Sequence, residues 1–425
     1  MKICLVQPNT SYQITKHRYA FALTFPQMVA NLGLRECDYE VYVGGKTLEP
    51  YECFLKTNRI THVFITSITS TFPQAVCYAK KAKELGCVTA LGGIFASSVS
   101  RTIADNFTCF DYICVGRASE NFLDLLNTGE TLARPAIFKS KAQDNMTAPL
   151  GEIMTNNKFT AVYDKKGPVC YELTQGCLFN CSFCTLRNAF GVGIRKRNRC
   201  AVEHDLVKLR HWESLKLIDD DIFQSLDILS DFSCRSFKQV IAEARIDHIS
   251  ESFLSIAQQF GVTHLITGIE AFDGQFLNES RKTGSTHWEK TINFVLNACE
   301  KYDIVLRPVI MMNYPGFTIN HARGILRSVK GWTPENHIEL LMSFYTPHPG
   351  LKLYNGELLT NDLQYFDHLN MVYKPDSIRY EEMPDLIEVY NEIVSLTESE
   401  DYNPPIKEIT HFLDEYQCFF KTTPM

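Results

Sequence analysis

The chain has 425 residues, of which 45% are hydrophobic and 21% are charged, a balance typical of folded globular domains. At roughly 150 residues per domain, this length predicts two or three domains. The 42 basic and 49 acidic residues give a net charge of −7, which argues against a dedicated nucleic-acid binder with a basic surface. No apolar run reaches the roughly 18 residues that a membrane span needs, so we expect none.

The N-terminus and the cysteines indicate the compartment. Residues 1–8 form a short apolar run that Pro8 ends, and no small-residue cleavage site follows it. This pattern predicts a first strand rather than a signal peptide, and therefore a cytoplasmic protein. Most of the 15 cysteines are then expected to be reduced thiols.

The first 130 residues alternate short apolar runs with helical patterns. Strands are predicted at 3–6, 40–43, 62–66, 88–91 and 112–115. Between them, residues 72–85 have alanines at helical spacing. Such alternation predicts an α/β fold, with an N-terminal Rossmann-type, doubly wound parallel sheet.

Ligands of such sheets bind beyond the carboxyl ends of the strands, where this chain is rich in glycine and hydroxyl residues. Glycine permits close backbone approach, and hydroxyls hydrogen-bond polar ligands, although ordinary tight turns have the same composition. The candidate binding residues are Ser67, Thr69, Ser70, Thr71, Gly92, Gly93 and Gly116.

A second alternation follows a segment at 131–165 that we interpret as a linker. Strands are predicted at 169–173, 215–218, 239–244, 263–268, 304–311 and 338–343. Six βα units over 166–355 predict a (β/α)6 partial barrel with its active site at the carboxyl ends of the strands. Residues 356–425 are predicted as a short helical C-terminal region, and the two domains are expected to have separate cores.

A cysteine cluster follows the first barrel strand. Cys177, Cys181 and Cys184 have x3 and x2 spacing in one loop, whereas a zinc site would need a fourth ligand. Cys170 lies inside the strand and is a poor candidate for that fourth ligand. Three thiolates can hold an iron–sulfur cluster and leave one iron open to a further ligand.

This loop resembles that of the radical S-adenosylmethionine (SAM) superfamily, which has the sequence C-x3-C-x-aromatic-C. The resemblance implies that the three cysteines hold a [4Fe-4S] cluster whose open iron binds SAM, which is cleaved to a 5′-deoxyadenosyl radical. It also implies SAM contacts for four residues at the loop and at the ends of the next strands. They are Phe183, Asp220, Arg245 and Glu270.

The doubly wound domain ahead of the barrel resembles the cobalamin-binding subgroup of that superfamily, over residues 1 to about 360. The resemblance implies cobalamin at the glycine and hydroxyl loops, in the cleft between the domains. It favours a C-methyltransferase, of the class B type, that acts on an unactivated carbon of a small molecule or peptide. One departure is Gly116-Arg117-Ala118-Ser119, where the subgroup usually has Gly-Glu-x-Glu.

Two alternatives remain open at this stage. The first is a radical rearrangement, oxidation or epimerisation enzyme that makes no methyl transfer, with Cys418 as a candidate hydrogen donor. The second resembles the tRNA methylthiotransferases, against which the acidic tail at 398–401 argues. A non-enzymatic iron–sulfur scaffold would not need the strand-end motifs.

Further expectations concern the reaction. Tyr345 and His348 follow the last barrel strand and are candidate catalytic residues. The remaining cysteines show no C-x2-C pair, so we expect one cluster and no auxiliary cluster. An external one-electron reductant of the flavodoxin or ferredoxin type is the expected partner.

Overall fold

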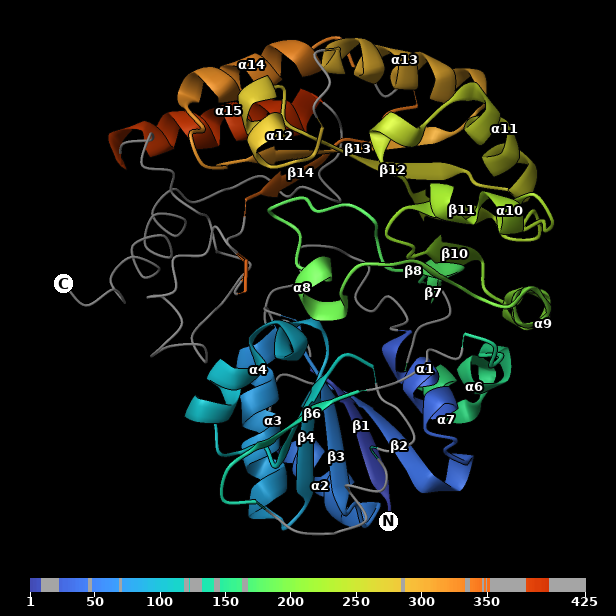
Figure 1. The fold of residues 1–425 in the computed structure, drawn as a ribbon, viewed down its shortest axis with the longest axis vertical. Helices are drawn as coiled ribbons and strands as arrows, with labels where there is room; N and C mark the ends of the chain where they lie inside the picture. The colour runs from blue at the N-terminus through green and yellow to red at the C-terminus, as the bar shows by residue number, and fades with distance from the viewer. Residues whose placement is uncertain are drawn as a thin grey trace.

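The computed structural model describes residues 1–8, 23–44, 48–68, 71–117, 122, 132–140, 146–162, 167–283, 287–332, 337–345, 348, 350–351 and 380–396. Figure 1 shows a parallel sheet with its helices at the N-terminal end of the chain, and above it a second, curved sheet wrapped by an arc of helices. No helix within these ranges is both long enough and apolar enough to cross a membrane.

The front sheet is parallel throughout, in the order β2-β1-β3-β4-β5-β6. Its strands are β1 (Ile3–Gln7), β2 (Tyr39–Val43), β3 (His62–Thr66), β4 (Val88–Gly92), β5 (Tyr112–Val115) and β6 (Ala136–Lys139). Its helices are α1 (Thr24–Asn31), α2 (Glu49–Thr57), α3 (Phe72–Glu84) and α4 (Ile94–Asn106). The predicted doubly wound sheet is therefore confirmed.

The segment that we interpreted as a linker differs from that expectation. Its residues 136–139 form β6, which pairs in parallel with β5 and extends the front sheet past residue 130. The segment also contains the short helices α6 (Gly151–Thr155) and α7 (Asn157–Thr160). Strand β6 alternates half-buried and exposed residues, and this weak apolar signal is typical of an edge strand.

The second sheet is also parallel, in the order β14-β13-β12-β11-β10-β7. These strands are β7 (Val169–Tyr171), β10 (Ser214–Leu217), β11 (Gln239–Glu243), β12 (His264–Glu270), β13 (Val305–Met312) and β14 (Leu341–Phe344). The outer helices are α9 (Arg199–Leu209), α10 (Leu226–Leu229), α11 (Glu251–Phe260), α12 (Gly274–Glu279), α13 (Trp288–Lys301), α14 (Ile319–Val329) and α15 (Met383–Leu396). All six predicted barrel strands are present.

A small antiparallel ribbon stands at the mouth of the barrel. Strand β8 (Thr174–Gln175) pairs with β9 (Arg195–Lys196), and the helix α8 (Leu186–Phe190) lies between them in the chain. Helix α8 packs against α4 of the front domain. The ribbon and helix therefore bring the loop between β8 and α8 to the boundary of the two domains (Figure 1).

The two domains do not have separate cores, which corrects our expectation. Strand β1 sends Cys4 and Val6 to a core beneath the front sheet, and Ile3 and Leu5 to the opposite face. The core on that opposite face continues without interruption into the barrel strands and their helices. A shared core fixes the two sheets relative to each other, because apolar interiors are closely packed.

Candidate active site

The cysteine loop leaves the barrel at the carboxyl end of β7 and β8. Cys177, Cys181 and Cys184 are each partly exposed. The Ser182 amide donates to the Ser280 carbonyl at 2.9 Å, and the Cys184 amide donates to the Cys181 carbonyl at 3.1 Å. These bonds fix the backbone of the loop that carries the three sulfur atoms.

The three thiols fit a cluster better than a single ion. Among the described residues, no three His, Cys, Asp or Glu side chains converge closely enough to hold one metal ion. Burial raises the pKa of Cys184 to about 11, and the neighbouring Cys181 thiol adds to this rise. In a [4Fe-4S] cluster each cysteine binds a different iron, so the sulfurs need not meet at one point.

Gly176 gives the loop its entry geometry. It has a φ of +95°, and a Cβ there would lie 2.2 Å from the Gly193 carbonyl oxygen, so only glycine fits without strain. Its amide donates to Asp220 Oδ2 at 3.1 Å. Gly176, the residue before Cys177, thus packs against Gly193 on one side and is hydrogen-bonded on the other to Asp220, which follows the second barrel strand.

The three aspartates after β10 hold three different parts of the site. Asp219 is buried and accepts from the Thr174 hydroxyl at 2.6 Å and from the amides of Leu173 and Thr174. Asp221, also buried, accepts from the Arg245 amide at 3.3 Å and from His248 Nδ1 at 2.7 Å. Both carboxylates hold neighbouring parts of the protein in place, because they accept hydrogen bonds from its backbone amides and side chains.

Asp220 is the member of this trio that faces open space. Its carboxylate lines the cavity between the domains, and burial raises its pKa to about 6. The Gly176 amide takes one of its acceptor positions. The other oxygen is available to a donor in the cavity, as the predicted contact with the SAM ammonium requires.

Arg245 lies against the cysteine loop. Its guanidinium donates from Nη1 to Cys181 Sγ at 3.5 Å and covers the Phe179 ring at 3.7 Å from the centroid. Two further bonds run to the Asp247 carboxylate, and Nη2 also donates to the Lys282 carbonyl at 2.6 Å. The predicted SAM residue is thus adjacent to the cluster ligands.

Glu270 and Phe183 are held by neighbours within the barrel. Glu270 has a φ of +66° at a bulge in β12, and its carboxylate forms a buried ion pair with Lys282 at 2.9 Å. Phe183 stacks on Phe276 at 6.3 Å, and Phe276 stacks on Tyr314 at 4.0 Å. Whether either contacts SAM stays a prediction.

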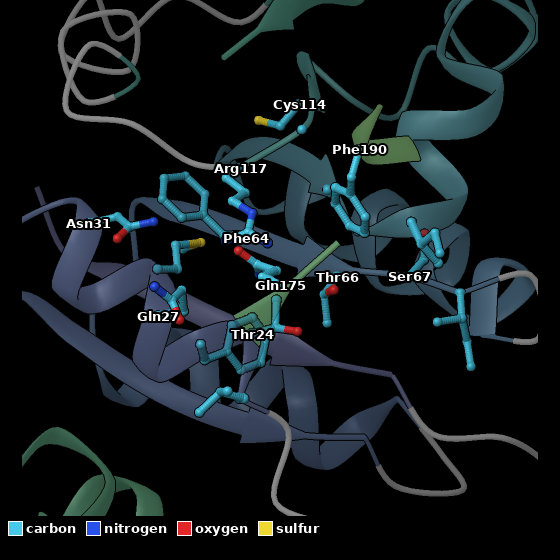
Figure 2. A pocket seen from close by; sticks show the side chains of 18 of the residues that line it. Thr24, Gln27, Asn31, Phe64, Thr66, Ser67, Cys114, Arg117, Gln175 and Phe190 are labelled. Atoms are coloured by element: carbon cyan, nitrogen blue, oxygen red, sulfur yellow. The ribbon is translucent and has the colours of Figure 1, made fainter. Parts of the chain in front are cut away.

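A cavity of about 460 Å³ lies between the carboxyl ends of the two sheets, where the sequence predicts a shared cleft. Figure 2 shows Ser67 and Arg117 of the front domain and Gln175 and Phe190 of the barrel around it. The cavity is mainly apolar, with hydroxyl and amide side chains at separate points. Its polar lining includes Thr24, Gln27, Asn31, Thr66, Ser67, Thr174 and Gln175.

Two of these polar atoms need a partner. Ser67 Oγ and Gln175 Oε1 are buried and make no hydrogen bond to any described residue. A buried polar atom without a partner costs about 1–3 kcal/mol, which a ligand in the cavity can offset. Gly93 lies against Ser67 on the same side of the cavity. A side chain does not fit at position 93, because a Cβ would clash with the Ser67 carbonyl oxygen and because φ is +98°.

Charged groups meet on the barrel side of the cavity. Arg117 covers the Phe190 ring at 5.7 Å, and burial lowers its pKa to about 10. Burial raises the pKa of Glu172 to about 7, although the adjacent Arg197 opposes this rise. Arg197 is fully buried and donates to the Glu172 carbonyl at 3.0 Å and to Gln27 Oε1 at 3.1 Å. Arg197 thus makes hydrogen bonds to residues of both domains.

Not every predicted residue reaches the cavity. Ser67, Gly92, Gly93 and Gly116 line it, whereas Thr69 and Ser70 lie outside the described residues. Thr71 does not line it, because its hydroxyl is part of its own turn, where it accepts from the Ile68 amide at 3.1 Å. Tyr345 is buried and its amide donates to Met312, and neither it nor His348 lines this cavity. Cys418 and the 398–401 tail lie outside the described residues.

Sequence reasoning did not single out Gln27, Glu172 and Gln175, which line the cavity, or Arg197, which donates to Gln27 and to the Glu172 carbonyl. Glu172 and Gln175 flank the end of a buried strand, and polar residues at that position are a usable signal. Arg197 carries no such signal, because it follows an exposed ribbon residue and stands 170 positions from its partner Gln27.

Together, the fold and the site define a class of protein: a doubly wound domain joined to a partial barrel, with a three-cysteine loop and a cavity between the two. No family model matches the chain. A solved structure of TsrM, a radical SAM methyltransferase from Kitasatospora setae with cobalamin and a [4Fe-4S] cluster bound, superposes with a TM-score of 0.69. It is 12% identical and the match covers 99% of both chains, which establishes the fold.

Two curated relatives are similar in sequence. Bacteriochlorophyllide d C-8(2)-methyltransferase of Chlorobaculum tepidum is 23% identical over 360 residues, which cover 77% of each chain. Hopanoid C-3 methylase of Methylococcus capsulatus is 22% identical over 338 residues, which cover 72% of this chain and 62% of the relative. The predicted resemblance to radical SAM proteins with a cobalamin-binding-type domain is thereby confirmed, as is the prediction of an enzyme.

Proposed function

We propose that the chain is a cobalamin-dependent radical SAM methyltransferase that acts on an unactivated carbon of a small molecule or peptide. The observation that carries this proposal is the cavity that residues of both sheets line. On one side it is lined by Ser67, Gly92 and Gly93, and on the other by Gln175 and Asp220, next to the cysteine loop. Both methyltransferase relatives named above support the same chemistry.

The apolar surface and the hydrogen-bonding groups of the cavity fit a corrin. That ring system is apolar over its faces and carries amide side chains at its edge, so it needs an apolar cleft with scattered hydrogen-bonding groups. Ser67 Oγ and Gln175 Oε1 are acceptors without a partner among the described residues, and amide N–H groups satisfy such acceptors. Gly93 permits close backbone approach at the same wall.

The barrel residues have separate tasks in this proposal. Cys177, Cys181 and Cys184 hold the cluster, and Asp220 accepts from the ammonium group of SAM. Arg245 keeps one Nη1 proton after its four protein bonds, which suffices for one bond to the SAM carboxylate. When bound, the cluster with SAM supplies the radical, and cobalamin supplies the methyl group.

The remaining parts of the proposal concern substrate and partner. Tyr345 and His348 follow β14 and are proposed to contact the substrate beyond the cavity. An external one-electron reductant of the flavodoxin or ferredoxin type is proposed to serve the cluster.

Anaerobically reconstituted protein with cobalamin, SAM and a chemical reductant tests the proposal. We expect both 5′-deoxyadenosine and S-adenosylhomocysteine as products, because the radical and the methyl group come from separate SAM molecules. Formation of 5′-deoxyadenosine alone would favour a radical enzyme without methyl transfer. If neither product forms, the proposal is wrong.

A further inference from the structure

Arg245 makes a contact that SAM binding does not require. It is 7% exposed at the carboxyl end of β11, and its Nη1 lies 3.5 Å from Cys181 Sγ. The guanidinium carbon also lies 3.7 Å from the centroid of the Phe179 ring, which belongs to the same loop as the sulfur. A permanent cation is thereby placed against one of the three thiols.

The position of this cation is fixed from several sides. Asp247 accepts from Nε at 3.0 Å and from Nη2 at 2.8 Å, a bidentate pair that sets the plane of the guanidinium. The Lys282 carbonyl accepts from Nη2 at 2.6 Å. The Arg245 amide in turn donates to the buried Asp221. The side chain therefore cannot leave Cys181 without breaking an ion pair.

We propose that Arg245 raises the reduction potential of the cluster by donating a hydrogen bond to the Cys181 thiolate. This inference rests on the proposed function, since it takes Cys181 as a cluster ligand. Reduction adds one electron to the cluster, and the thiolates carry part of the added charge. A charge-assisted donor at a thiolate stabilises the reduced form more than the oxidised form, and hydrogen bonds to sulfur are known to set cluster potentials.

The experiment is a potentiometric titration with dithionite, followed by the EPR signal of the reduced cluster, on reconstituted wild-type protein and on Arg245→Gln. We expect the variant to assemble about four irons per chain and to have a more negative midpoint potential. Lys301→Gln is the control, because it removes one cation from an exposed ion pair on α13, with no contact to the cysteine loop among its described bonds. Its potential should equal that of the wild type.

A second variant protects the test against misfolding. Arg245→Gln leaves Asp247 without its partner, so the double variant Arg245→Gln/Asp247→Asn removes the whole ion pair and keeps the net charge. It should show the same negative shift, because the N–H···S bond is lost in both.

The outcomes separate the two hypotheses. An assembled cluster with an unchanged potential in either variant overturns the role of Arg245 and leaves the proposed function intact. Failure of both variants to assemble a cluster also overturns it, because Arg245 would then be structural. Failure of the wild type to assemble any cluster would refute the proposed function itself.

Discussion

The two walls of the inter-domain cavity are built on different principles. The front wall is built of apolar and small residues, with Gly93 pressed against Ser67, and its one charged residue among those described, Arg117, covers the Phe190 ring of α8. The barrel wall is charged, and Glu172 and Asp220 stand there with their pKa raised by burial. The front wall therefore accepts a ligand by shape, and its variants should act through steric effects. The barrel wall controls charge, and its variants should change cluster assembly, titration or potential.

Cys181→Ala should have the largest effect, and it should affect the cluster but not the binding of cobalamin. Loss of one of three cluster ligands should abolish cluster assembly and 5′-deoxyadenosine production, measured by iron analysis and chromatography. The front wall should still bind cobalamin, because the lost side chain belongs to one surface loop. Cys200→Ala, at an exposed cysteine on α9, is the matched control and should behave as wild type. Retained 5′-deoxyadenosine formation by the first variant would remove the radical SAM assignment.

Gly176→Ala should damage the cysteine loop without removing a ligand. The added Cβ would meet the Gly193 carbonyl oxygen, and the positive φ adds strain, at a total cost of about 2 kcal/mol. We expect a lower iron content per chain and a lower unfolding temperature. Gly274→Ala, where a Cβ meets no atom and φ is not positive, is the control. Equal iron content in the two variants would mean that this turn does not position the ligands.

Ser67→Leu tests the front wall by shape. The larger side chain enters the cavity and removes an acceptor, so we expect the Kd for hydroxocobalamin to rise at least tenfold, about 1.4 kcal/mol. Equilibrium dialysis measures this, and the iron content should stay at the wild-type level. Thr71→Ser keeps the hydroxyl of a residue that lies outside the cavity and should bind normally. Unchanged binding by a folded Ser67→Leu protein would exclude this wall as the cobalamin site.

Glu172→Gln should have the smallest effect on cofactor binding, and its effect should appear in the pH dependence of stability. Because its pKa is raised from 4.5 to about 7 in the folded chain, the folded state retains a proton that the unfolded state has released. The contribution of this group to the free energy of unfolding therefore falls as pH rises from 4.5 to 7, by about 3 kcal/mol. Urea unfolding at several pH values should give a flatter profile for the variant. Glu203→Gln, exposed on α9, should keep the wild-type profile, and an unchanged profile for Glu172→Gln would contradict the account.

Much of the fold and the position of the cysteine loop were predictable from the sequence, because short local patterns specify them. Apolar runs of four to eight residues located the front and barrel strands, and the cysteine spacing located the cluster loop. Ser67 and Gly93 were found because βα loops at one sheet edge share a ligand side. Strand β6 escaped detection because an edge strand with exposed residues has little apolar signal.

The rest depends on contacts between distant parts of the chain. Arg197 reaches Gln27 only because the two sheets share one core, which sequence periodicity does not reveal. Among the adjacent aspartates the family resemblance pointed to Asp220, which lines the cavity, but no local pattern indicated that Asp219 and Asp221 accept backbone hydrogen bonds from distant residues. Thr71 had the same composition signal as Ser67, but its hydroxyl is used in its own turn.

The most direct test of the shared cavity is whether the protein binds cobalamin and the iron–sulfur cluster at the same time and close together. Wild-type protein should be reconstituted anaerobically with iron, sulfide and hydroxocobalamin, freed of excess cofactor, reduced, and examined by EPR. We predict one cobalamin and about four irons per chain, with magnetic coupling between cob(II)alamin and the reduced cluster because the cysteine loop begins directly after Gln175, which lines the cavity. Protein that retains the four irons but binds no cobalamin, or binds it without any coupling, would contradict the account.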